Sequence, residues 1–136
     1  MGTNIRTQLS KKNAYWLPKH RQLELVHFCL QYPEWKKKIA DLDDYSVRSH
    51  SIIETSKNDG LLTNPVEQIV EERLYLESLI FLIEDVAKEV AGDLCEYLLR
   101  GITEGVGYEK LFAPCCKDVY YKLYRRFFWT MDKVRR

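Results

Sequence analysis

Residues 117–136 repeat apolar side chains at the spacing of an α-helix, and this pattern constrains the fold more than any other feature of the chain. Pro114 precedes it, cannot continue a helix begun before it, and biases Ala113 toward an extended conformation. A new helix is therefore expected after a turn over residues 113–116. Its apolar face is expected to consist of Tyr120, Leu123, Tyr124, Phe127, Met131 and Val134.

The order of segments before this helix predicts a helix-turn-helix. Asp93 is expected to cap a helix over 94–103, which a short glycine-bounded helix over 107–112 and the turn then follow. In a helix-turn-helix the last helix enters the major groove of DNA, about 12 Å wide, and its first residues reach base edges. The expected base-reading residues are Lys117, Asp118, Tyr121, Lys122 and Arg125, and the expected phosphate contacts are Arg126, Lys133, Arg135 and Arg136.

A more ordinary interpretation of the same helix stays open. Any amphipathic helix at the surface presents a solvated charged face, and basic residues there need no ligand. Trp129 lies on this polar face, where it is expected to pack against another element.

Charge is distributed unevenly along the chain, although the net charge is only +1. From Val66 to Glu109 there are three Lys and Arg residues against eleven Asp and Glu residues, whereas from Lys117 to Arg136 there are seven against two. A basic closing helix behind an acidic body is the asymmetry that a one-sided contact with DNA requires. The acidic part would then face away from the DNA or toward a protein partner.

Catalytic and metal-binding sites are not indicated. The four cysteines lack the spacing of a zinc site or a disulfide framework, so Cys29, Cys95, Cys115 and Cys116 are expected to be reduced thiols, the first two in the core. The carboxylates of the long acidic segment have no His or Cys partner at a defined spacing. We expect no enzymatic activity, no cofactor and no metal ion. No apolar run reaches the roughly 20 residues of a membrane span, and no signal segment opens the chain, so a cytoplasmic location is expected.

The N-terminal part is expected to be a helical pair followed by a linker. Within residues 1–42 the two helices begin at Pro18 and Pro33. Over residues 43–63 Ser, Asn, Asp and Gly interrupt the helical period, which predicts a loop or hinge with a short helix over 47–54 as an alternative.

A long central helix is expected next. Asn64 fits its N-cap, Pro65 its first residue and Gly92 its stop. Such a helix spans roughly 40 Å, which is more than a small core needs. Apolar residues that include Leu74 and Phe81 lie on more than one face. The helix is therefore interpreted as an interaction surface, with one face on the C-terminal helices and another on the N-terminal pair or a second subunit. The expected inner residues are Ile69, Leu76, Leu79, Ile80, Ile83, Val86, Ala87 and Val90.

Several motifs of residues 64–136 occur in this order in a known family. They are the Pro-initiated long helix, a capped helix ending Thr103-Glu104-Gly105, the sequence Gly107-Tyr108-Glu109-Lys110-Leu111, and an aromatic basic run from Val119 to Trp129. This part of the chain resembles the RinA/ArpU-type regulators of phages of Gram-positive bacteria, whose C-terminal unit looks like the helix-turn-helix of sigma factor region 4. The resemblance implies an all-α regulator of phage or prophage genes that acts in a bacterial host cell, with host RNA polymerase as a partner.

Two functions are consistent with these patterns. The first is a transcriptional regulator that binds double-stranded DNA. Because a lone helix-turn-helix reads few base pairs, a homodimer through the long central helix is expected. The second is a non-enzymatic helical protein-interaction module, an inhibitor or assembly adaptor from a mobile element, whose acidic helix imitates the charge of DNA. Phosphate contacts weaken steeply with salt and an apolar protein interface does not, so salt dependence separates the two.

Overall fold

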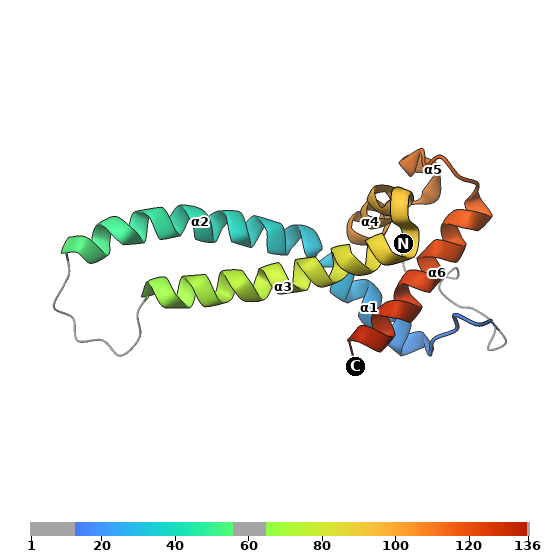
Figure 1. The fold of residues 1–136 in the computed structure, drawn as a ribbon, viewed down its shortest axis with the longest axis horizontal. Coiled ribbons are helices and arrows are strands. Elements are labelled where there is room, and N and C mark those ends of the chain that lie inside the picture. The colour runs from blue at the N-terminus through green and yellow to red at the C-terminus, as the bar shows by residue number, and fades with distance from the viewer. Residues whose placement is uncertain (1–12, 56–64, 136) are drawn as a thin grey trace. The chain divides into compact units, whose positions relative to one another are not determined.

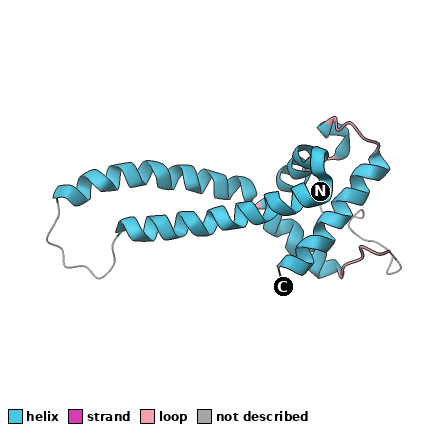
Figure 2. Cartoon of the chain, viewed as in Figure 1, coloured by secondary structure: helices cyan, strands magenta, loops and turns pink. Residues whose placement is uncertain are grey.

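The computed structural model describes residues 13–55 and 65–135, and every regular element in these ranges is helical (Figure 1 and Figure 2). The predicted all-α class is therefore confirmed. None of the described helices has the length and apolar character needed to cross a membrane. The elements are α1 (Lys19–Leu30), α2 (Tyr32–Thr55), α3 (Pro65–Ala91), the 3-10 helix η2 (Gly92–Leu94), α4 (Cys95–Glu104), α5 (Tyr108–Leu111) and α6 (Lys117–Val134).

The chain divides into two compact units. The first unit comprises Met1–Pro33 and Leu82–Arg136, and the second comprises Glu34–Phe81. Helix α2 runs on to Thr55, so residues 43–55 of the expected linker are helical, and they include the helix over 47–54 that was the alternative. Ser and Asp interrupt the apolar period there, but each costs a helix well under about 1 kcal/mol, and neither Gly nor Pro follows Pro33 within α2. Residues 56–63 of that linker, and the expected N-cap Asn64, lie outside the described residues.

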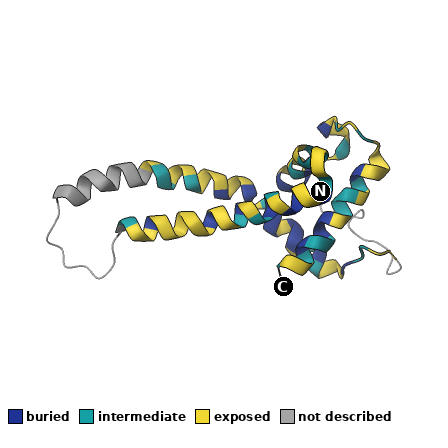
Figure 3. Cartoon of the chain, viewed as in Figure 1, coloured by how far each residue is buried: buried dark blue, intermediate teal, exposed yellow. Residues whose placement is uncertain are grey.

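The core of the first unit is built around α1, α4 and α6. Helix α1 contacts α4 and α6, and α4 also contacts α5 and α6. A hydrogen-bonded ion pair joins Arg21 of α1 to Asp132 of α6, with Nε and Oδ1 2.7 Å apart. Among the residues whose burial is described, the largest fully buried side chains all belong to this unit, and they are Phe127, Phe128, Leu25, Ile83, Leu98, Leu111, Met131, Val86 and Cys29. Figure 3 shows buried positions in dark blue on α1 and α6.

The cysteine predictions are met in part. All four residues are free thiols, and Cys29 is buried as expected, whereas Cys95 is only half-buried. Cys95 is the first residue of α4 and therefore lies at the margin of the core rather than inside it.

The second unit pairs α2 with α3, which run side by side in Figure 1. Arg73 Nη1 of α3 lies 2.6 Å from Asp43 Oδ1 of α2, and Arg73 Nε lies 2.8 Å from Glu77 Oε1 one turn along α3. Trp35 of α2 is buried, as are Ile69, Leu76 and Ile80 of α3. The inner stripe predicted for α3 is thus confirmed over both units, except that Leu79 is only half-buried.

The end of α3 is as expected and the start of α4 is not. Gly92 follows the last residue of α3 with a φ of 56°, a left-handed conformation that glycine adopts without steric cost. Asp93, predicted to cap the next helix, instead lies inside η2, and α4 begins at Cys95. The prediction was wrong because a 3-10 turn continues the backbone bonding between the two helices, so no extended capping residue separates them.

Candidate nucleic-acid interface

A short helix and a tight turn position the start of α6. Helix α5 is a single turn that ends where Phe112 adopts a left-handed conformation, with φ 54° and ψ 36°. The Cys115 N–H then donates a hydrogen bond to the Ala113 carbonyl at 2.8 Å, and the Tyr108 hydroxyl donates one to the Cys115 carbonyl. Cys116 is extended, and α6 begins at Lys117. The predicted order of elements is present, although the helix expected over 107–112 is shorter.

Aromatic side chains anchor the inner face of α6. Tyr120, Phe127 and Met131 are buried as predicted. Phe128 is also buried, although the helical period did not place it inside; its ring centroid lies 5.0 Å from that of Tyr124 and 5.1 Å from that of Phe127. Val134, predicted to be inside, is 50% exposed because it is the last residue of the helix.

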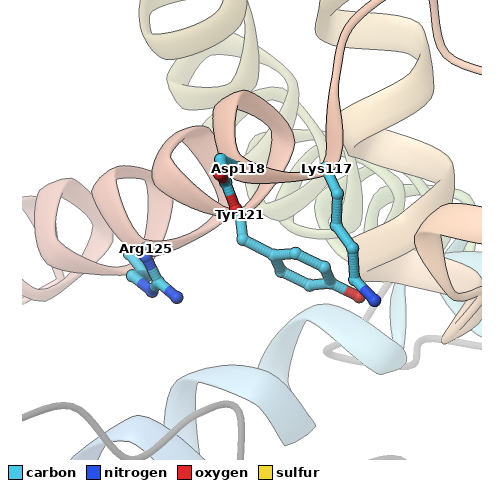
Figure 4. Close-up of a pocket in the computed structure, with 4 residues that line it drawn as sticks. All are labelled: Lys117, Asp118, Tyr121 and Arg125. Atoms are coloured by element: carbon cyan, nitrogen blue, oxygen red, sulfur yellow. The ribbon is translucent and has the colours of Figure 1, made fainter.

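Four of the five predicted base-reading residues line one recess. A pocket of about 300 Å³ is lined by Lys117, Asp118, Tyr121 and Arg125. Figure 4 shows the Tyr121 ring extending toward the end of the Lys117 side chain, with Arg125 one turn further along α6. Lys117 Nζ lies 3.1 Å from Glu109 Oε1, so this cation is already paired. With Asp118 also in the lining, the recess is polar but carries little net positive charge.

Arg125 is partly committed to packing. The residue is half-buried, and its Nε is a buried atom that has no hydrogen-bond acceptor. A buried donor without a partner costs free energy, so the Arg125 Nε–H group is expected to donate a hydrogen bond to a water molecule or to an acceptor outside the chain. Substitution of Arg125 would therefore change both packing and charge.

Lys122 and Arg126 are two of the predicted contacts that are exposed to solvent. Both side chains are exposed, and neither makes an ion pair or a hydrogen bond within the described part of the chain. They are one helical turn apart, a rise of about 6 Å, on the side of α6 away from the buried aromatic residues.

The cations at the end of α6 have aromatic partners. Lys133 Nζ lies 3.4 Å from the centre of the Trp129 ring, and Arg135 Cζ lies 3.7 Å from the centre of the Phe28 ring. Trp129 also packs edge-on against Tyr15 at 5.6 Å, which confirms that it contacts another element. Arg136, predicted to contact phosphate, lies outside the described residues.

The prediction of the interface missed several exposed apolar side chains. Phe112 is 86% exposed beside the turn, and Val70 and Tyr75 are exposed on α3, as are Leu74 and Phe81. The signal for Phe112 was available, because a helix must end before Ala113-Pro114 and so leaves Phe112 at a solvent-exposed corner. No group of His, Cys, Asp and Glu side chains that could hold a metal ion occurs among the described residues.

Comparison with protein-family models, curated proteins and solved structures finds no match to this chain.

Proposed function

We propose that this chain is a DNA-binding transcriptional regulator of phage or prophage genes whose α6 contacts the duplex. The observation that carries the proposal is the outward face of α6, where Lys122 and Arg126 are exposed and free of ion pairs. Cations that are not neutralised within the protein can displace the counterions of DNA phosphates at no internal cost. The order α4, α5, turn and α6 supports a helix-turn-helix, and the resemblance to the RinA/ArpU-type regulators supports the phage context.

Exposure and existing partners rank the residues that we expect to make the proposed contacts. Lys122 and Arg126 become the main contacts, and Lys117, Asp118, Tyr121 and Arg125 form a polar recess beside them. Lys133 and Arg135 are secondary, since each already lies over an aromatic ring. Arg136 stays a proposed phosphate contact.

Binding to a pool of random duplexes at about 50 and 200 mM salt, followed by sequencing of the retained DNA, tests the proposal. The wild type should retain an enriched motif with affinity that falls steeply with salt. Lys122→Glu/Arg126→Glu should weaken binding strongly. It should also reduce the slope of log affinity against log salt concentration by about two, which corresponds to two lost phosphate contacts.

Lys37→Glu/Lys38→Glu is the matched control, because it makes the same charge change at two exposed positions of α2. It should bind DNA nearly as the wild type does. Equal loss in both double variants would mean that only net charge matters and that α6 is not the contact. Absence of any retained DNA at low salt would remove the proposed function.

A protein-interaction module is the second candidate, and the exposed apolar side chains of α3 favour it. Such a module would bind its partner with little loss of affinity between the same two salt concentrations if apolar contacts dominate. The contrast with the steep dependence expected for DNA separates the two functions.

A homodimer through α3 and a contact with host RNA polymerase extend the first proposal. Two half-sites about one DNA turn apart would gain affinity from a dimer. Sedimentation of the free chain and of the chain on a selected duplex tests this, and a monomer in both states would remove the dimer. Retention of purified RNA polymerase by the chain on that duplex tests the second partner.

A further inference from the structure

Three exposed apolar side chains follow one line along α3 within the second unit. Val70, Leu74 and Phe81, termed here the α3 stripe, are spaced four and seven residues apart, so they fall within a sector of about 40° on the helix. Leu74 is 58% exposed and Phe81 is 66% exposed. The stripe lies on a different face from the buried Ile69, Leu76 and Ile80, so it is not the margin of that buried stripe.

Uncompensated carboxylates border the stripe. Glu67 and Glu71 lie along one side of it, are exposed, and make no ion pair or hydrogen bond within the described residues. Glu77 lies on the other side and is paired with Arg73, whose charge Asp43 also shares. The surface around the stripe is therefore acidic on balance.

The Ser78 side chain, near the stripe, already has a hydrogen-bond acceptor within α3. The Ser78 hydroxyl, between Leu74 and Phe81 in sequence, donates to the Tyr75 carbonyl at 2.6 Å and is thus satisfied within α3. A partner could cover this surface without burying an unpaired hydroxyl.

We propose that the α3 stripe docks a basic amphipathic helix of another protein. Anchors at one-turn and two-turn spacing over a rise of about 16 Å are the pattern of helix-against-helix recognition. Lys or Arg beside the apolar face of the partner would pair with Glu67 and Glu71. A second copy of α3 would bring the same carboxylates together, so a basic helix is the better occupant of the stripe, and a homodimer through α3 would have to use residues outside it. This inference does not depend on the binding of DNA by α6.

Two synthetic helical peptides test the proposal by fluorescence anisotropy. Both carry Leu at helical spacing along one face; the first has Lys on both flanks of that face, and the second has Glu at the same positions. The wild type should bind the Lys peptide at least about tenfold more tightly than the Glu peptide, because the charge preference comes from the acidic border.

Protein variants locate the binding to the stripe. Leu74→Ser/Phe81→Ser should lower affinity for the Lys peptide at least about tenfold. Val119→Ser/Val134→Ser, which changes two exposed apolar residues of α6, should not lower it. Glu67→Lys/Glu71→Lys should transfer the preference to the Glu peptide. All these side chains are exposed, and far-UV circular dichroism would check that each variant is folded.

Three results would overturn the proposal. The first is no binding of the Lys peptide by a folded wild type, and the second is equal affinity for both peptides. The third is a dimer in sedimentation that Leu74→Ser/Phe81→Ser converts to a monomer, which would show that a second copy covers the stripe.

Discussion

Gly101 of α4 lies against Tyr120 of α6 so closely that a Cβ atom on Gly101 would come within 2.0 Å of the Tyr120 hydroxyl oxygen. The same Cβ would lie 3.2 Å from Leu111 Cδ1. Tyr120 is buried, and its ring contacts those of Tyr108 and Tyr121 at centroid distances of 5.6 and 5.1 Å. Because neighbours enclose the tyrosine, the absence of a side chain at residue 101 is what lets α4 and α6 approach.

Gly101→Ala should therefore destabilise the fold even though alanine favours helices. Overpacking of this kind costs about 1–3 kcal/mol, more than the roughly 1 kcal/mol that Ala gains over Gly in a helix. Urea unfolding of Gly101→Ala, with and without Tyr120→Phe, measures the effect. Gly101→Ala should destabilise the fold less when Tyr120→Phe has removed the hydroxyl group. If the two substitutions change the free energy of unfolding additively, the proposed contact is contradicted.

How far the sequence alone predicted this structure depends on the range of each interaction. The inner residues of α3, including Ile83 and Val90, followed from a period set within one helix. The contact of Gly101 with Tyr120 did not, because two segments that are separate in sequence must first pack. The same holds for the candidate interface. The exposure of Lys122 followed from the helical pattern, whereas the pairing of Lys117 with Glu109 and the stacking of Arg135 on Phe28 required the tertiary structure.

The ion pair between Arg21 and Asp132 predicts a difference between two carboxylates that share one arginine. Asp132 and Arg21 are largely buried, with side chains 18% and 25% exposed, whereas Glu24, the other carboxylate paired with Arg21, is 61% exposed. The Asp132 hydrogen bond is also the main cause that raises the pKa of Arg21 above its ordinary value. Asp132→Asn should lower the free energy of unfolding by about 1–2 kcal/mol, and Glu24→Gln by under about 0.5 kcal/mol. Urea unfolding measures both values. Equal losses of unfolding free energy in Asp132→Asn and Glu24→Gln would show that burial does not make the Arg21–Asp132 pair stronger than the Arg21–Glu24 pair.

The left-handed backbone of Phe112 predicts that glycine is the better residue at this position. Gly105 ends α4 in the same conformation, with a φ of 70°, and has no Cβ to clash with the backbone. Phe112 adopts a φ of 54° with its ring exposed, so little packing offsets the strain of about 1–2 kcal/mol. Phe112→Gly should raise the free energy of unfolding by about 0.5–1 kcal/mol after the entropic cost of glycine. Phe112→Ala keeps the Cβ and should show no such gain, which thermal unfolding of the two variants would check.

Partial burial of Tyr124 predicts a loss of stability in alkali. Its pKa is raised from 10.0 to about 12, mainly because the interior disfavours the charged phenolate, with Cys29 and Tyr121 acting in the same direction. Below pH 10 the phenol is neutral in both folded and unfolded chains, so its full contribution is present. Above pH 10 the unfolded chain releases this proton first, and stability should fall by roughly 2 kcal/mol as the pH approaches the folded pKa. Burial also raises the pKa of Cys29 and of Tyr120, so these two groups add to the fall in stability at alkaline pH.

Tyr124→Phe removes one titrating group without removing the ring, which isolates its share of this decline. Urea unfolding of the wild type and of the variant at pH 8 and at intervals up to pH 12 should show the smaller loss in the variant. The difference should develop above pH 10, because only there does the unfolded phenol ionise while the folded one stays neutral. Parallel curves for the two proteins over the whole range would mean that Tyr124 ionises equally in the folded and unfolded chains, and that the aromatic face of α6 is open to solvent at this residue.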